Sequence, residues 1–319
     1  MGNGAKGRGR HVTDSGCVAR RGTVTNGRSD PTKQESGNTV FLNYSFAVML
    51  QSANIATNAV TENQLKILAI ANQKGGSGKT TTAVSLAAAL AERGRRVLLV
   101  DLDQQGNAST WLGHTDGGED LLNVFLGMKA LASTVRESGV ENLSIIPTSR
   151  IFAKADLALV TDPDALFVLR REISRFDETA FDYMIFDCPP TLGIVTTNAL
   201  VAADSVVVPT EPTSLSTTGV ANLFETIARL RETHNPELDI LGILLCRYDG
   251  RTRLTRDIED KLLTAYADLI LPRSIRQNVR IAEAHAFRQP ITTYDPTSAA
   301  SADYRAVAEI VEARAGRED

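Results

Sequence analysis

Aromatic residues and cysteines are scarce in this chain. Only 5% of its 319 residues are aromatic, so we expect a core of alanine, valine, leucine and isoleucine, which suits parallel strands buried on both faces. The three cysteines, Cys17, Cys188 and Cys246, form no Cys-x-x-Cys pair. Their spacing argues against a disulfide framework, an iron–sulfur cluster and a zinc site, and it fits a reducing compartment.

The chain also lacks a membrane-length apolar run and an excess of basic charge. No apolar stretch reaches the roughly 18 residues that a membrane-spanning helix needs. The stretch 40–55 is mildly apolar and follows basic residues, so a secretory signal is an alternative interpretation, but polar side chains interrupt it. The formal net charge is −4, so any contact with nucleic acid requires a local basic patch.

Residues 1–63 differ in composition from the rest of the chain. The first forty residues are rich in glycine, serine, threonine and asparagine, show no hydrophobic periodicity, and contain seven Lys or Arg against three Asp or Glu. We interpret 1–63 as a disordered basic tail, which could add weak, non-specific affinity for DNA. Met49 is an alternative start of the protein, in which case the residues before it would not be translated.

From residue 65 onward, apolar runs of strand length alternate with helical patterns. The expected strands cover 66–72, 96–103, 143–147, 183–189, 205–209 and 240–247. The expected helices cover 80–93, 164–176, 193–202, 216–232, 253–267, 280–287 and 301–315. This alternation predicts an α/β fold: a three-layer, doubly wound, mostly parallel sheet flanked by helices. Because no internal repeat or linker interrupts the pattern, we expect 64–319 to form a single domain.

A glycine-rich loop, Lys-Gly-Gly-Ser-Gly-Lys-Thr, lies between a predicted strand and a predicted helix. That context is the one a phosphate-binding P-loop requires, because glycines let the backbone wrap phosphate oxygens and the helix N-terminus favours an anion. Lys79 is expected to neutralise the β- and γ-phosphates, and the Thr80 hydroxyl to bind Mg²⁺. The residues predicted to bind the nucleotide are Lys74, Gly75, Gly76, Ser77, Gly78, Lys79, Thr80 and Thr81.

Lys74 is a second lysine at the start of the same loop. Within one subunit it has no room to serve the phosphates beside Lys79. Two interpretations stay open: a solvated loop lysine, or a lysine that reaches the nucleotide of a neighbouring subunit.

Acidic residues end two of the predicted strands. Asp101 and Asp103 lie on the same side of one strand because side chains alternate with a period of two, and Asp187 ends another. Ligands of open α/β sheets bind at the carboxyl ends of the strands. We therefore predict that Asp103 and Asp187 contribute to Mg²⁺ binding and that Asp103 approaches the attacking water. Asp101 is interpreted as a supporting or structural residue.

These motifs together resemble those of the deviant Walker A ATPases and, among them, the ParA/Soj partition ATPases. The matching stretches, in chain order, are Lys74–Thr80, Asp101–Asn107, Asp187–Gly193 and Asn278–Ala284, followed by Pro290 and Tyr294–Pro296. The resemblance covers about residues 65–313. It implies a deviant P-loop NTPase fold and an ATP hydrolase with slow intrinsic turnover.

The resemblance also implies roles for individual residues of the site. The catalytic residues would be Lys74, Lys79 and Asp103, with Lys74 contacting the nucleotide across a sandwich dimer. Gly76 would lie close to the backbone of the partner subunit. The residues that hold the metal would be Thr80, Asp103 and Asp187.

Two arginines are implied to bind DNA: Arg251 in an Asp-Gly-Arg-Thr stretch and Arg280 in an Asn-Val-Arg stretch. Further arginines gather around both positions, which in an acidic protein is typical of a phosphate-contacting strip. The alternative is a solvated face balanced by neighbouring acidic residues. Residues 275–277 read Ile-Arg-Gln where many family members have Ile-Pro-Arg, so the adenine-contacting residues stay open.

The combined prediction is a cytoplasmic, nucleoid-associated ATPase that drives chromosome or plasmid partition. Its cofactors would be ATP and Mg²⁺. Its partners would be a second copy of itself in the presence of ATP, non-specific double-stranded DNA, and a ParB-like centromere-binding protein that stimulates hydrolysis. Two alternatives use the same ATPase: positioning of another cargo, and membrane cycling of the MinD type, which the short acidic segment 308–319 does not favour.

Overall fold

The computed structural model describes residues 64–315 except 117, 178 and 214–215. The predicted tail over 1–63, with Met49, lies outside the described residues. Within them, one sheet contains β1 (Lys66–Ile70), β2 (Val97–Asp101), β3 (Arg136–Val140), β4 (Leu143–Ile146), β5 (Tyr183–Asp187), β6 (Ser205–Thr210) and β7 (Asp239–Leu245). The strand order is β3-β4-β2-β5-β1-β6-β7, and every neighbouring pair is parallel except β3 with β4.

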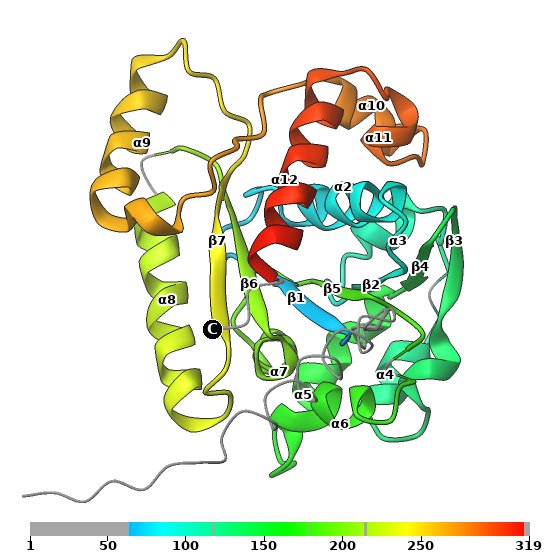
Figure 1. Ribbon diagram of the computed structural model, residues 1–319. Coiled ribbons are helices and arrows are strands. Elements are labelled where there is room, and N and C mark those ends of the chain that lie inside the picture. The colour runs from blue at the N-terminus through cyan, green and yellow to red at the C-terminus, as the bar shows by residue number, and fades with distance from the viewer. Residues whose placement is uncertain (1–63, 117, 178, 214–215, 316–319) are drawn as a thin grey trace, which may run out of the picture. The chain divides into compact units, whose positions relative to one another are not determined.

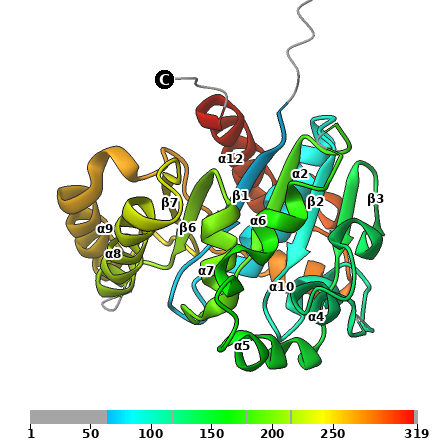
Figure 2. The same cartoon turned by 90° about the horizontal axis from the view of Figure 1, so that it is seen from below.

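Helices cover both faces of this sheet (Figures 1 and 2). On one face lie α2 (Lys79–Glu92), α3 (Asn107–Trp111), α10 (Arg280–Ala286), α11 (Ile291–Tyr294) and α12 (Ala299–Ala315). On the other lie α4 (Asp120–Phe125), α5 (Lys154–Leu159), α6 (Val168–Ile173), α7 (Ile194–Ala202), α8 (Ser216–Thr233) and α9 (Arg253–Tyr266). The predicted three-layer, mostly parallel α/β fold is confirmed.

Side-chain alternation along the central strands builds one hydrophobic core on each face. In β1, Ile67 and Ala69 point into the core that contains α7 and α8, whereas Leu68 and Ile70 point into the core around α2. All four side chains are buried. A strand that is buried on both faces needs apolar residues at every position, which is why these strands read as unbroken apolar runs.

The structure differs from the predicted elements where a helix is short or a strand is polar. β3 was not predicted, because its sequence Arg-Glu-Ser-Gly-Val is polar and it is an antiparallel edge strand with an irregular register. The single helix expected over 164–176 is a 3₁₀ turn, Ala165–Phe167, followed by α6. The short helices α3, α4, α5 and α11 are four to six residues long, too short to show a helical period.

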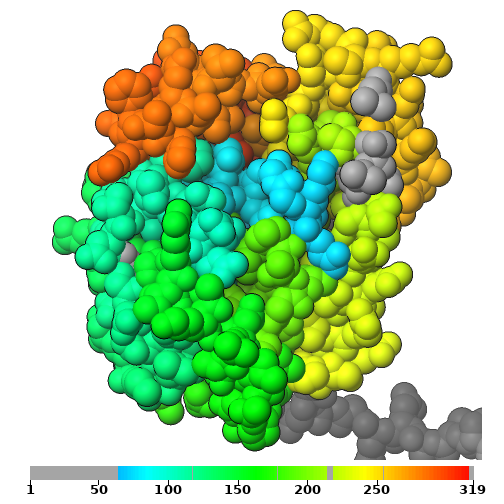
Figure 3. Space-filling model, turned by 180° about the vertical axis from the view of Figure 1, so that it is seen from behind, coloured from blue at the N-terminus to red at the C-terminus, as the bar shows by residue number. Residues whose placement is uncertain are grey.

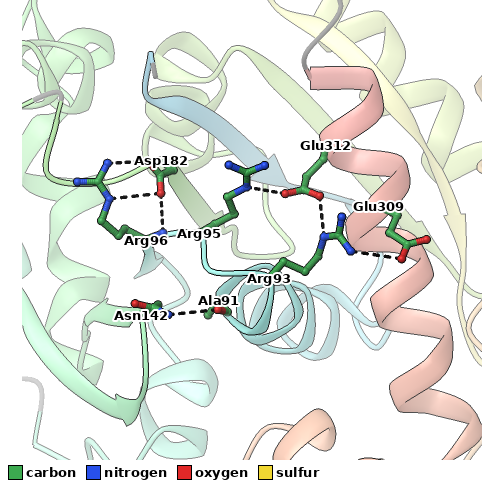
Figure 4. Close-up of polar contacts among 8 residues, drawn as sticks. All are labelled: Ala91, Arg93, Arg95, Arg96, Asn142, Asp182, Glu309 and Glu312. Atoms are coloured by element: carbon green, nitrogen blue, oxygen red, sulfur yellow. Dashed lines mark hydrogen bonds and ion pairs between the residues drawn. The ribbon is translucent and has the colours of Figure 1, made fainter. Parts of the chain in front are cut away.

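Ion pairs fix the end of α2 that lies opposite the phosphate loop (Figure 4). Arg93 and Arg95 each place Nε 2.6 Å from the carboxylate of Glu312 in α12, and Arg93 also pairs with Glu309. Arg96 pairs at 2.6 Å with Asp182, immediately before β5. Partly exposed pairs of this kind each contribute little to stability, because solvent screens them. Together they join the phosphate-loop helix to the sheet and to α12.

Candidate nucleotide-binding site

The phosphate loop follows β1 and leads directly into α2, as predicted. Gly76 and Gly78 have φ of +75° and +94°, which L side chains rarely adopt. Gly78 also lies against Cys246, after β7: a Cβ added at Gly78 would lie 3.3 Å from the Cys246 Cβ. The loop therefore requires glycine both for its backbone conformation and for this contact.

Lys79 folds back over the loop. Its Nζ donates a hydrogen bond to the carbonyl oxygen of Lys74 at 3.2 Å, so the ammonium group lies within the curve of the loop. Burial lowers the pKa of Lys79, while the nearby Asp187 and Asp103 carboxylates oppose that shift. An anion inside the loop would offset the cost of burying this lysine, as expected of a phosphate site.

Lys74 points away from the loop toward the connection between β6 and α8. Its Nζ donates to the Thr213 hydroxyl at 2.5 Å, and its backbone N–H donates to the Asn72 side chain at 3.0 Å. Asn72 is buried and donates in turn to the carbonyl oxygen of Pro209 at 2.7 Å. Lys74 is therefore half-buried and hydrogen-bonded within its own chain, rather than fully solvated as the first interpretation had it.

The three predicted carboxylates converge at the ends of β2 and β5. Asp101 and Asp187 are register partners on these neighbouring strands. Asp101 accepts hydrogen bonds from Ser109, from its backbone N–H at 2.7 Å and its hydroxyl at 2.6 Å. Asp103 accepts one from the Gln105 backbone N–H at 3.0 Å. Asp101 thus anchors α3, and Asp103 holds the turn before that helix.

Asp187 is fully buried, and no described residue makes a hydrogen bond of ordinary geometry to either of its carboxylate oxygens. Burial raises its pKa well above the usual value, and the neighbouring Asp101 raises it further, while the nearby Thr80 hydroxyl and Lys79 lower it. An unpaired buried carboxylate is costly. Carboxylate and hydroxyl oxygens are the ligands that Mg²⁺ prefers, so Asp187 and Thr80 fit a magnesium ion directly or through water.

A cavity of about 600 Å³ opens beside the loop. It is lined by the predicted residues Gly75, Gly76, Gly78, Lys79, Thr80, Thr81 and Asp103. Lys74, Ser77 and Asp187 lie outside its lining. On the far side the wall is formed by residues 275–279, the segment in which the adenine contacts were left open.

Four residues that the sequence analysis did not single out for the site also line the cavity: Trp111 of α3, Cys246, His285 of α10 and Tyr304 of α12. Tyr304 is fully buried and more than 200 residues along the chain from the loop. No local pattern links it to the loop, whereas Trp111 lies only four residues beyond the matching stretch that ends at Asn107.

The two predicted DNA-binding arginines lie on segments that flank the phosphate loop. In Figure 3 the light-blue phosphate-loop segment lies between α10, in orange, and the β7–α9 connection, in yellow. The Arg251 side chain is 90% exposed and pairs with Asp249 at 2.8 Å. The Arg280 side chain is 52% exposed and pairs with Glu283 at 2.7 Å.

Two arginines of the second sequence cluster are held by a buried carboxylate. Arg273 and Arg276 both pair with the buried carboxylate of Asp303 in α12, at 2.5 and 2.8 Å. A buried carboxylate without these partners would be strongly destabilising. These two arginines therefore stabilise the packing of α12, and Arg276 also lines the nucleotide cavity. The ion-pair partners of Arg280, in contrast, are at least partly exposed.

Comparison with known proteins places this site in a family. The AAA domain family model matches residues 65–240. The chain is 38% identical over 250 residues to the sporulation initiation inhibitor protein Soj of Bacillus subtilis, a match that covers 78% of this chain and 98% of that protein. It is 40% identical over 251 residues to the chromosome-partitioning ATPase Soj of Thermus thermophilus, covering 79% and 97%. The chain belongs to the ParA/Soj family of partition ATPases.

A solved structure agrees with the P-loop NTPase fold of this ParA/Soj family member. Cobyrinic acid a,c-diamide synthase from Mycobacterium smegmatis, crystallised with ADP and magnesium, superposes with a TM-score of 0.68 at 33% identity. The match covers 79% of this chain and 97% of that one. Among the helices of the described residues, none has the length and apolar character to cross a membrane.

Proposed function

We propose that this ParA/Soj protein is an ATP hydrolase whose nucleotide state controls dimer formation and non-specific binding to double-stranded DNA. Its cofactors are ATP and Mg²⁺. The observation that carries the ATPase assignment is the buried, unpartnered carboxylate of Asp187 beside Lys79 and Thr80 at a glycine-lined loop. A magnesium–phosphate complex supplies both the cation that Asp187 lacks and the anion that Lys79 lacks.

Different residues of the site bind the phosphates, bind the metal and orient the attacking water. The backbone from Gly75 to Thr81 and the Lys79 ammonium hold the phosphates, while Thr80, Asp103 and Asp187 form the metal side of the site. When bound, Mg²⁺ neutralises charge on the phosphates. Asp103, which lines the cavity, orients the attacking water. Intrinsic turnover is slow, as the resemblance to partition ATPases implies.

Lys74 serves the nucleotide of a second subunit in an ATP-dependent homodimer. In the single chain its ammonium group is held by one hydrogen bond to Thr213. A hydrogen bond from a charged group is worth about 1.5–3 kcal/mol. Contact with a phosphate would outweigh it, because the acceptor is then an anion rather than a neutral hydroxyl. Gly75 and Gly76 are exposed at the loop tip, where a partner backbone could approach.

Arg251 and Arg280 bind DNA phosphates in this dimer. Both side chains are exposed at the surface, and their present partners are exposed or half-buried carboxylates: Asp249 for Arg251, and Glu283 and Asp295 for Arg280. Surface ion pairs contribute little stability, so replacing a carboxylate by a phosphate oxygen costs little. Binding of this kind releases counterions and weakens steeply as salt rises.

The cellular role that follows is chromosome or plasmid partition. A ParB-like protein bound to a centromere-like site stimulates hydrolysis and releases the dimer from DNA. In this role the ATPase is cytoplasmic and associated with the nucleoid. Residues 64–319 act as one ATPase domain. Positioning of a different cargo with the same switch is the second candidate, and membrane cycling of the MinD type is the third.

DNA binding by the Asp103→Ala protein tests the proposal, measured on unrelated fragments with ATP, with ADP and without nucleotide. Binding that appears only with ATP and ignores sequence supports the nucleotide switch and the DNA role together. If dimers form with ATP but do not bind DNA, the ATPase assignment stands and the partition role is rejected. Binding to lipid vesicles would then be measured instead. Protection of one specific promoter sequence would contradict non-specific binding.

A further inference from the structure

Trp111 joins two parts of the protein that are far apart in sequence. It is the chain's single tryptophan, ends α3, and is only 4% exposed. Its indole N–H donates to the carbonyl oxygen of Gln289, between α10 and α11, at 2.7 Å. Its ring meets the His285 ring of α10 edge to face, with centroids 4.9 Å apart. The indole therefore holds α3 against α10.

The other end of α3 is held by the carboxylate strand β2. Asp101 accepts two hydrogen bonds from Ser109, and the Gly106 backbone N–H donates to the carbonyl oxygen of Asp103 at 2.8 Å. Ser109 also accepts a bond from the Thr148 backbone N–H at 2.9 Å. Because these hydrogen bonds hold all of this five-residue helix, it moves as one unit. A shift of the turn at Asp103 therefore displaces the Trp111 indole at the end of the helix.

The α10 side is similarly rigid. Gln289 donates its backbone N–H to the carbonyl oxygen of Ala284 at 3.0 Å, which closes the end of α10. The preceding Arg288 has a φ of +56°, a conformation that non-glycine residues rarely adopt. Glu283 accepts bonds from both Arg280 and Tyr294, which ties the first residue of α10 to α11. A shift at Gln289 is therefore carried to Arg280.

Trp111 and His285 also line the nucleotide cavity, as Lys79 and Asp103 do. A ligand in that cavity faces the contact between α3 and α10, in addition to the phosphate loop. The two ends of the link are thus the proposed water-orienting turn and the proposed DNA-binding helix, with the nucleotide between them.

We propose that Trp111 is a positioning residue that couples the Asp103 turn to α10, so that the nucleotide state sets how Arg280 is presented to DNA. The inference rests on the proposed function. Coupling between two sites is a free energy and is reciprocal. The decisive quantity is a coupling factor, the ratio of DNA dissociation constants measured with ADP and with a non-hydrolysable ATP analogue.

The test is Trp111→Phe, which keeps an aromatic ring and removes the N–H that reaches Gln289. We expect the coupling factor, measured at saturating nucleotide, to fall at least about fivefold, the lower end of typical allosteric coupling. His285→Ala, at an exposed position, removes the ring contact and is expected to lower the factor in the same direction. Phe176→Leu, a buried aromatic change near the start of β5, is the control for general destabilisation and should keep the wild-type factor.

A Trp111→Phe protein that folds and keeps the wild-type coupling factor overturns the inference while leaving the proposed function intact. If the proposed function itself is wrong, the wild-type protein will bind DNA equally with ADP and with the ATP analogue, or not at all. A second measurement does not need DNA: tryptophan emission reports Trp111 alone in the wild-type protein. It should change when the ATP analogue and Mg²⁺ saturate the site, and an unchanged emission spectrum would also overturn the inference.

Discussion

The Cβ of Cys246 lies directly against Gly78 of the phosphate loop, 3.3 Å from where a Gly78 side chain would begin. The two residues are 168 positions apart, and the contact joins the end of β7 to the loop. Burial raises the pKa of the Cys246 thiol to about 12, so the group is a neutral packing partner at physiological pH. The end of β7 thereby limits how closely the phosphate loop can approach the sheet.

Gly78→Ala should abolish ATP binding, because the new methyl group meets Cys246 and the backbone holds φ at +94°. Gly94→Ala is the matched control: its φ is +81°, but a methyl group there meets no atom within 4 Å. Both variants should lose about 1–2 kcal/mol of stability from the left-handed conformation. Calorimetric titration with ATP and Mg²⁺ separates them, and equal ATP affinities in the two proteins would contradict the role of the Cys246 contact.

Asp187→Asn should stabilise the nucleotide-free protein at neutral pH while removing Mg²⁺-dependent ATP binding. The raised pKa means that the folded state holds this proton more tightly than the unfolded chain. That contribution to stability is full below the ordinary carboxyl pKa and is lost as pH rises through the raised value. Removing the buried charge should contribute about 1 kcal/mol or more.

Thermal unfolding of both proteins across pH checks this expectation. The wild-type protein should lose stability on passing from acid toward neutral pH more steeply than Asp187→Asn, with Asp101 contributing the slope that remains. Parallel curves for the two proteins would show that Asp187 is not buried as an unpaired carboxyl group. Added ATP and Mg²⁺ should raise the midpoint of the wild-type protein only.

Thr213→Val should strengthen ATP-dependent dimers by about tenfold or more. The substitution keeps the shape of the side chain but removes the hydroxyl that holds the Lys74 ammonium, and a hydrogen bond from a charged group is worth about 1.5–3 kcal/mol. Sedimentation with an ATP analogue measures the effect. Thr226→Val, whose hydroxyl bonds back within α8, should leave the dimer constant unchanged, and Lys74→Ala should prevent the dimer from forming. Weaker dimers in Thr213→Val would argue that the hydroxyl positions Lys74 for its partner.

Arg251→Glu combined with Arg280→Glu should lose DNA binding at about 100 mM salt and keep ATP-dependent dimers. Each position carries an exposed guanidinium group beside the phosphate-loop face. Arg171→Glu with Arg229→Glu changes the net charge by the same amount at exposed positions on α6 and α8, away from that face. If the control pair loses DNA binding equally, overall charge explains the result rather than the two arginines. Unchanged binding by the test pair would point to the basic segment 1–63.

Local motifs account for the parts of the site that the sequence predicted. A strand, a glycine-rich turn and a helix are contiguous in the chain, so the positions of Lys79 and Thr80 follow from their neighbours. Asp187 was predictable for a similar reason: it ends an apolar run, and the ends of parallel strands meet at one edge of the sheet.

Long-range packing accounts for what the sequence did not show. Tyr304 reaches the cavity from the last helix, and no periodicity in α12 distinguishes it from an ordinary core residue. The sequence analysis grouped Arg273 and Arg276 with the phosphate-contacting strip around Arg280. Asp303, however, becomes buried only when α12 packs on the sheet, and it then takes these two arginines as partners. The Lys74–Thr213 bond likewise exists only because β6 lies next to β1.

The ion pairs between the end of α2 and α12 have a consequence for where the functional unit ends. The family match over 65–240 contains the phosphate loop and all three carboxylates, yet Glu312 holds the far end of the helix on which that loop is mounted, and Tyr304 closes the cavity wall. The smallest fragment that binds ATP should therefore run to the last turn of α12. A chain truncated within α12 would keep every motif residue but would no longer bind ATP.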